Sequence, residues 1–326
     1  MIFLNIAILI IGFVALVKGA DIFVDGSAGL ARRFRVPSLI IGLTIVALGT
    51  SLPELAVSTT AAIQGSNEIA LSNVVGSNIF NLLVVLGLCA AISAVPVDRA
   101  VLRRDFPLNI FITILVLAGA AIPSLLNGTF FSLGMNEKAG MVSRPLAIIL
   151  LVLFVSYIIY LIYDAKKHPL PQEEESSLQP LLKSILFIVL GIVLIVAGGK
   201  AVVYSAKEIA RFAGMSETLI GLTVVALGTS LPELVTSIVA ARKGETELAV
   251  GNVIGSNIFN LLFILGVSSA IHPISVIAAS VYDLVILTFV TVLSFVFSLT
   301  GKKINRAEGL CMLLLYVAAT VFAAIR

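Results

Sequence analysis

Long apolar runs alternate with short polar loops along this chain, and the pattern predicts a bundle of membrane-spanning helices. A bilayer span needs about 20 mostly apolar residues, and many segments reach that length. We predict ten spans, at residues 3–24, 38–63, 69–93, 106–123, 145–163, 182–204, 217–241, 247–271, 281–299 and 307–325. The first run carries its basic residues after the apolar stretch, which is typical of a retained helix and not of a signal peptide.

The longest polar stretch divides the spans into two sets of five. It runs from Asp164 to Pro180 and includes three consecutive glutamates, Glu173 to Glu175. Acidic runs of this kind are usually solvated, so we interpret residues 164–181 as a linker and not as a calcium-sensing site. The chain then consists of a first five-helix repeat (residues 1–163), the linker, and a second five-helix repeat (residues 182–326).

The two halves are related by sequence. Gly42–Gly87 aligns with Gly221–Gly266 without a gap, at a constant offset of 179 residues, and 31 of the 46 positions are identical. The identities include Thr, Ser, Pro, Glu and Asn, which similarity between two apolar helices would not produce by chance. Because five spans is an odd number, the second repeat must enter the membrane upside down, which is the arrangement of many secondary transporters.

Composition agrees with a membrane protein and excludes some other classes. Hydrophobic residues make up 59% of the chain and charged residues only 12%, whereas soluble domains have about 25% charged residues. A net charge of +3 is too small to indicate nucleic-acid binding. Of the 21 Lys and Arg residues, 15 fall on one predicted side. By the positive-inside rule we expect both termini outside a plasma (inner) membrane and the linker in the cytoplasm.

Each repeat carries the motif GTSLPE in the middle of a predicted span, ending in Glu54 and in Glu233. A carboxylate at that depth is costly and is functional by default. Equivalent glutamates of an inverted pair should approach each other, which favours a shared proton or a bound cation. Pro53 and Pro232 should break the helices and free backbone carbonyls, such as that of Ala47, as further oxygen ligands.

Further oxygen atoms come from neighbouring helical positions. Ala47, Thr50 or Ser51, and Glu54 recur at three- and four-residue intervals and therefore share a face. The motif GSNIFN in the next span places Ser77 and Asn81 four residues apart. We expect the remaining asparagines of these spans to bond between helices, at least in part; they are Asn73, Asn78, Asn252 and Asn257. An all-oxygen set suits Ca2+ or Na+ and disfavours zinc and copper.

GTSLPE followed by GSNIFN, present twice, resembles the alpha repeats of the calcium:cation antiporter superfamily, in its prokaryotic sodium/calcium exchanger branch. The resemblance implies ten helices in two inverted repeats, with helices 2, 3, 7 and 8 broken around a midplane site. It implies that Glu54 and Glu233 bind calcium, and that helices 1 and 6 slide across the others. It implies sodium sites at Ala47, Thr50, Ser51, Ser77 and Asn81, with Ala226, Thr229, Ser230, Ser256 and Asn260.

One position departs from that family pattern. Sodium/calcium exchangers often carry aspartate at one of the positions matched by Asn81 and Asn260, but both are asparagine here. The charge of the site is then about −2 from two ionised glutamates. The leading hypothesis is a calcium antiporter driven by sodium, and the alternative is coupling to protons or potassium.

Other classes fit less well. Two glutamates would repel an anionic substrate. Of the two histidines, His168 lies in the linker and His272 at the end of a span, so no catalytic pair can be placed at the midplane. We therefore expect no enzyme activity, no cofactor and no nucleic-acid partner. The expected partners are Ca2+, Na+ and the lipid bilayer, with no obligate protein partner evident.

Overall fold

The protein is an all-helical multi-pass membrane protein. The computed structural model describes residues 2–65, 67–128, 133–169, 178–214 and 226–325. Within those ranges eight helices are long and apolar enough to cross a membrane, or nine spans when one bent helix pair counts as a span. The predicted span 217–241 begins outside the described residues, at 217–225, and so does part of the linker, at 170–177.

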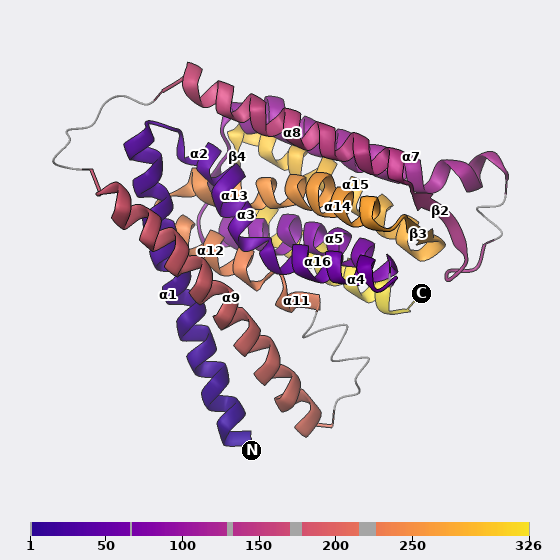
Figure 1. Cartoon of the computed structure of the whole chain (residues 1–326), viewed down its shortest axis with the longest axis horizontal. Coiled ribbons are helices and arrows are strands. Elements are labelled where there is room, and N and C mark those ends of the chain that lie inside the picture. The colour runs from indigo at the N-terminus through magenta and orange to yellow at the C-terminus, as the bar shows by residue number, and fades with distance from the viewer. Residues whose placement is uncertain (1, 66, 129–132, 170–177, 215–225, 326) are drawn as a thin grey trace. The chain divides into compact units, whose positions relative to one another are not determined.

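Figure 1 labels most of the helices and strands along the chain. The helices of the first repeat are α1 Ile2–Phe34, α2 Ser38–Ile41, α3 Ala47–Thr50, α4 Leu52–Ile63, α5 Asn67–Phe80, α6 Leu86–Ile92, α7 Phe106–Leu126 and α8 Arg144–Lys167. Those of the second are α9 Leu181–Phe212, α11 Ala226–Gly228, α12 Leu231–Arg242, α13 Thr246–Phe259, α14 Leu265–Ile271, α15 Ala278–Leu299 and α16 Arg306–Ile325. The π-helical turns are η1 Gly42–Val46, η2 Asn81–Val85, η3 Val101–Asp105 and η7 Asn260–Ile264, and η8 Thr300–Lys302 is a 3-10 turn. The strands are β1 Val95–Pro96, β2 Lys138–Val142, β3 Ile274–Ile277 and β4 Lys303–Ile304.

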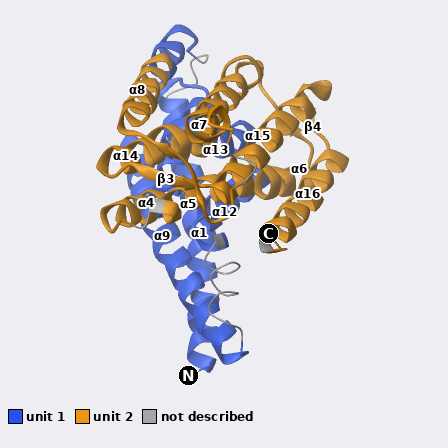
Figure 2. Cartoon of the chain, turned by 90° about the vertical axis from the view of Figure 1, so that its right-hand side faces the viewer, with its two compact units in different colours: residues 1–53, 161–255 blue, residues 54–160, 256–326 orange. Residues whose placement is uncertain are grey.

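The chain forms two compact units, and each takes segments from both sequence repeats (Figure 2). Unit 1 consists of residues 1–53 and 161–255, and unit 2 of residues 54–160 and 256–326. The compact units are therefore interleaved along the chain. The sequence repeats, in contrast, follow one another.

In unit 1 the long helices α1 and α9 pack side by side along a seam of small residues (Figure 1). A Cβ added to Gly19 would lie 2.8 Å from Leu194 Cβ, and one added to Gly198 would lie 2.7 Å from the carbonyl oxygen of Gly12. Gly26 approaches Phe187 in the same way. Later residues of α1 contact earlier residues of α9, so the two helices are antiparallel. Small residues allow this close backbone contact inside a membrane.

Unit 2 contains a second antiparallel pair, α7 and α15. Strand β1, just before η3, pairs with β4 at the end of α15. Strand β2, after α7, pairs with β3 before the start of α15. The rings of Phe106 and Phe295 meet between the two helices with their centroids 5.6 Å apart. Residues 106–126, shifted by 179, fall on 285–305, so α7 and α15 are largely equivalent elements of the two repeats running in opposite directions.

Helix 2 is broken as predicted, but helices 3 and 8 are not. Ser38–Thr50 and Leu52–Ile63 meet at an angle of 51°, with the break at Ser51. In contrast, Glu68–Ile92 and Thr246–Ile271 are each continuous, so the expected breaks in these helices were wrong. Each contains a π turn that starts at the last asparagine of its GSNIFN motif, which is Asn81 in helix 3 and Asn260 in helix 8. A π turn widens a helix without ending it, and such turns are frequent at functional sites.

Candidate ion-binding site

Both motif glutamates lie in the first turn of a helix. Helix α3 ends at Thr50, Ser51 leaves the helical region (φ −84°, ψ 9°), and α4 starts at Leu52. Ser230 has nearly the same conformation (φ −92°, ψ 4°) before α12. The prolines fall in the first turn, where a missing N–H costs little. The amino end of a helix carries partial positive charge, which stabilises a carboxylate placed there.

The glutamates are buried, and serine hydroxyls bond to them. Glu54 has no exposed surface and Glu233 has 1%. In unit 1 the Ser51 hydroxyl donates to Glu233 Oε1 over 2.8 Å. In unit 2 the Ser77 hydroxyl donates to Glu54 Oε1 over 3.4 Å. We refer to the segments Ser51–Glu54 and Ser230–Glu233 as the first and second carboxylate turns.

An asparagine braces each carboxylate turn from the following helix. Asn73 Nδ2 donates to the Glu54 carbonyl at 3.3 Å and to Ser58 Oγ at 2.9 Å. Asn252 Nδ2 donates to the Glu233 carbonyl at 3.4 Å and to Ser237 Oγ at 2.9 Å. These contacts fix the backbone of the turn relative to the helix beside it. The sequence predicted that Asn73 and Asn252 form hydrogen bonds between helices. The structure shows the acceptors, which are the glutamate carbonyls and the hydroxyls of Ser58 and Ser237.

In unit 1, Asn252 also faces a predicted ligand. The Thr50 hydroxyl lies within hydrogen-bonding distance of Asn252 Oδ1 at 3.0 Å and of the Val46 carbonyl at 3.1 Å. The Ala47 carbonyl accepts the backbone N–H of Ser51 at 3.0 Å. The expectation that Ala47 loses its helical partner was therefore wrong, because the helix breaks only after Thr50. The Thr50 hydroxyl also lies 3.4 Å from the same carbonyl oxygen.

Four asparagines join helices 3 and 8 within unit 2, and we call them the asparagine clasp: Asn78, Asn81, Asn257 and Asn260. Asn78 Nδ2 donates to the Asn257 carbonyl at 3.1 Å, and Asn257 Nδ2 donates to the Asn78 carbonyl at 3.2 Å. Asn81 Nδ2 donates to Asn257 Oδ1 at 3.1 Å, and Asn260 Nδ2 donates to Asn78 Oδ1 at 2.9 Å. The side chains of Asn81 and Asn260 are fully buried.

The predicted ligands divide between the two units. Unit 1 holds the buried residues Ala47, Thr50, Ser51, Ser230 and Glu233, together with half-buried Thr229. Unit 2 holds Glu54, Ser77, Asn81, Ser256 and Asn260, all buried. Ala226 begins α11, and the environment of its side chain lies outside what the structure describes. Hydrogen bonds link Ser51 to Glu233 and Ser77 to Glu54.

Sequence reasoning missed two parts of this arrangement. It did not single out Ser58 and Ser237, although the 179-residue offset relates them just as it relates Asn73 and Asn252. The repeat alignment therefore contained the signal. It also missed the π turns, which have no such signature in the motif letters.

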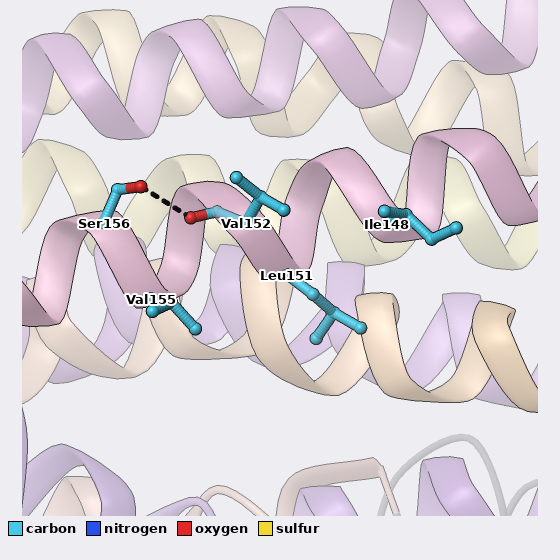
Figure 3. A pocket seen from close by; sticks show the side chains of 5 residues that line it. All are labelled: Ile148, Leu151, Val152, Val155 and Ser156. Atoms are coloured by element: carbon cyan, nitrogen blue, oxygen red, sulfur yellow. Dashed lines mark hydrogen bonds between the residues drawn. The ribbon is translucent and has the colours of Figure 1, made fainter.

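A shallow apolar groove of about 310 Å3 on α8 is not a candidate for cation binding (Figure 3). It is lined by Ile148, Leu151, Val152, Val155 and Ser156. The Ser156 hydroxyl already donates to the Val152 carbonyl at 2.8 Å. This groove offers a cation no charged ligand.

Comparison with known proteins points to one family. The family model described as sodium/calcium exchanger protein matches residues 4–163 and 183–325, which correspond closely to the two predicted repeats. Among relatives, the sodium/calcium exchanger MaX1 of Methanosarcina acetivorans is 34% identical, over 98% of this chain and 99% of that protein. The inner membrane protein YrbG of Escherichia coli is 37% identical, over 82% of this chain and 80% of that protein.

A solved structure of the sodium-calcium exchanger NCX_Mj, soaked with 10 mM Na+ and zero Ca2+, has the same fold as this chain. The match covers 100% of both chains, with a TM-score of 0.82 and 31% sequence identity. The similarity therefore extends over the whole molecule and is not confined to the duplicated motifs.

Proposed function

Because this chain belongs to the sodium/calcium exchanger protein family and is a sodium/calcium antiporter, we propose that Glu54 and Glu233 bind the transported calcium ion together. The proposed sodium ligands are Ala47, Thr50, Ser51, Ser77, Asn81, Ala226, Thr229, Ser230, Ser256 and Asn260. Two carboxylates neutralise one Ca2+, and amide, hydroxyl and carbonyl oxygens complete the six to eight ligands that calcium favours.

The observation that carries this proposal is the repeated geometry of the carboxylate turns. Each unit buries one glutamate at a helix amino end and braces the backbone of that glutamate with one asparagine. A buried carboxylate away from water requires compensation by positive charge. The helix dipole and hydrogen bonds such as those from Ser51 and Ser77 supply part of it, and a bound cation would supply positive charge directly.

We propose transport by alternating access in ten spans arranged as two inverted five-helix repeats. The antiparallel packing of the equivalent pairs α1 with α9 and α7 with α15 supports this arrangement. In this mechanism α1 and α9 slide together past the rest of the bundle. The glycines between α1 and α9, such as Gly19 and Gly198, form a glycine seam in which larger side chains could not fit between the two backbones. This close contact supports the movement of the two helices as one body.

We further propose an inner-membrane location with both termini outside and residues 164–181 in the cytoplasm. The distribution of Lys and Arg supports this orientation, and the relative YrbG is an inner membrane protein. Labelling of single cysteines placed near residue 2 and in the 164–181 segment, from each side of the membrane, would test it.

Calcium uptake into sodium-loaded proteoliposomes tests the transport function directly. We expect 45Ca to enter when sodium is replaced outside and to leave when the sodium gradient is reversed. Absence of uptake under an outward sodium gradient, from protein that is folded and correctly inserted, would contradict the function.

Coupling to protons or potassium is the competing assignment, and one observation favours it. Both family-variable positions, Asn81 and Asn260, are neutral here, so the site charge is about −2 with both glutamates ionised. The same vesicles distinguish the cases: sodium-free exchange driven by a pH gradient, or a requirement for potassium, would replace simple sodium coupling.

A further inference from the structure

The hydrogen bonds of the asparagine clasp fix which way its amides face. A backbone carbonyl accepts hydrogen bonds and cannot donate them. The atom of Asn78 that faces the Asn257 carbonyl must therefore be Nδ2, and the same holds for Asn257 against the Asn78 carbonyl. This removes the usual ambiguity between oxygen and nitrogen in asparagine side chains.

Each of these two amides then fixes the orientation of a second asparagine on the facing helix. With Nδ2 of Asn78 committed to a carbonyl, its Oδ1 faces Asn260, which must then donate through Nδ2. Asn257 imposes the same orientation on Asn81. The remaining atoms, Oδ1 of Asn81 and Oδ1 of Asn260, are buried and accept no hydrogen bond from the described residues. Two carbonyl-type oxygens are thus turned away from the clasp with free lone pairs.

We propose that Asn78 and Asn257 are positioning residues of the exchanger, which hold the amides of Asn260 and Asn81 so that only oxygen faces the transported cation. This inference rests on the proposed function in one respect, namely that Asn81 and Asn260 are ligands. Asn78 and Asn257 themselves do not contact the ion in this scheme. Outer partners of metal ligands commonly act in this way.

The clasp also restricts which residue fits at the ligand positions. An aspartate at position 81 would place a carboxylate oxygen against Asn257 Oδ1, and two acceptors repel unless the carboxyl group is protonated. The same conflict would arise between position 260 and Asn78 Oδ1. Asparagine at positions 78 and 257 is therefore matched to the neutral amides that this chain carries at 81 and 260.

The first test is Asn257→Ala, which removes the acceptor that orients Asn81. We expect the KM for calcium to rise about tenfold while kcat changes little, in line with outer-partner losses at metal sites. Asn78→Ala should act likewise through Asn260. The matched control is Asn109→Ala on α7, which should leave KM unchanged. The side chain of Asn109 is buried and has no hydrogen-bond partner among the described residues.

A second measurement separates positioning from simple structural support. Asn81→Asp should exchange only when its carboxyl group is protonated, so its activity should fall as pH rises. Adding Asn257→Ala removes the opposing acceptor and should flatten that pH profile. If the two substitutions are additive at every pH, or if Asn257→Ala and Asn78→Ala keep wild-type KM, the positioning role is wrong.

Folding and function are checked separately. Thermal melts of purified protein, with and without calcium, report whether Asn257→Ala is folded and how strongly it binds the ion. If Asn257→Ala does not fold, the pH profile of Asn81→Asp alone decides. Failure of the proposed function would appear as normal exchange by Glu54→Gln and Glu233→Gln. Failure of the clasp proposal would leave those variants inactive.

Discussion

The two carboxylate turns are near copies in their bracing, although the two glutamates belong to different compact units. The bonds from Asn73 and from Asn252 to their braced carbonyls differ by 0.1 Å, and the bonds to the serines are equal at 2.9 Å. Each glutamate also accepts from a serine of its own unit: Glu233 from Ser51 over 2.8 Å, and Glu54 from Ser77 over 3.4 Å. In the repeat alignment Ser51 corresponds to Ser230, and Ser77 corresponds to Ser256.

One glycine beside helix 2 is tightly packed. Gly255 lies against helix 2, where an added Cβ would be 2.7 Å from Leu43 Cα and 2.9 Å from Ala47 Cβ. Its repeat equivalent is Gly76, and the repeat equivalent of Leu43 is Leu222, which lies outside the described residues. The comparison between the copies therefore rests on the carboxylate turns and their asparagine braces.

The largest expected effect comes from removing either carboxylate. Glu54→Gln and Glu233→Gln should each reduce sodium-driven calcium uptake at least 100-fold, because a lost buried charge partner costs about 2–5 kcal/mol. Uptake of 45Ca into proteoliposomes measures it. The control is Glu68→Gln on the exposed start of α5. Near-normal uptake by only one of the two glutamine variants would show that the copies are not equivalent partners.

The tight packing of Gly255 predicts a clear cost for a single added methyl group. Gly255→Ala should lower the free energy of unfolding by about 1–3 kcal/mol, since overpacking of this kind forces the helices apart. The exposed control Glu68→Gln should change it by about 0.5 kcal/mol or less. Thermal melts in detergent compare the two variants, and equal destabilisation would refute the close packing of Gly255.

The braces predict a moderate and matched effect. Asn73→Ala and Asn252→Ala each remove hydrogen bonds to a carboxylate turn and leave a buried carbonyl and serine, at a cost of about 1–3 kcal/mol. Both should raise the KM for calcium to a similar extent, because the two braces have nearly the same geometry. Initial rates over a calcium series give the KM values. A large rise in KM for only one of the two variants would contradict matched braces.

The smallest effect concerns a contact present in one copy only. Lys243 Nζ, at the end of α12, lies 2.6 Å from Asp21 Oδ1 and 2.6 Å from Asp25 Oδ1 on α1. The repeat equivalent of Lys243 is Gln64. Lys243→Gln should therefore cost about 1 kcal/mol at most, because surface ion pairs contribute little. Urea unfolding in low and high salt measures this cost.

The pH dependence of that contact has a definite sign. Partial burial lowers the pKa of Lys243, but hydrogen bonds to Asp21 and Asp25 outweigh burial and raise the pKa above 10.5. A raised lysine pKa gives stabilisation that is fully present below the unfolded pKa and is lost as pH rises through the folded value. The difference between wild type and Lys243→Gln should thus stay constant from pH 7 to 9 and disappear only in strong alkali. Loss of the difference near pH 8 would contradict this assignment.

Much of this molecule could be predicted from sequence because duplication repeats the signal. Apolar run length indicated the eight or nine spans found among the described residues. The paired GTSLPE motifs indicated a break in helix 2 and the buried Glu54 and Glu233, but not the exact position of the break at Ser51. The sequence did not show that helices 3 and 8 stay continuous. They are interrupted only by π turns, such as the one at Asn81, and a π turn has no glycine or proline signature that sequence reasoning could recognise. The directions of the asparagine amides also depend on a facing helix, so no local pattern around Asn78 specifies them.

The length of the α1 and α9 pair has a consequence for the lipid environment. Helices of 33 and 32 residues are each about 50 Å long, whereas the hydrocarbon layer is about 30 Å thick. Such helices meet a thin or thick bilayer by changing their tilt. Because the glycine seam joins them, they should tilt as a pair. The length of the lipid acyl chains would then change the tilt of this pair, and with it the exchange rate, independently of any ion gradient.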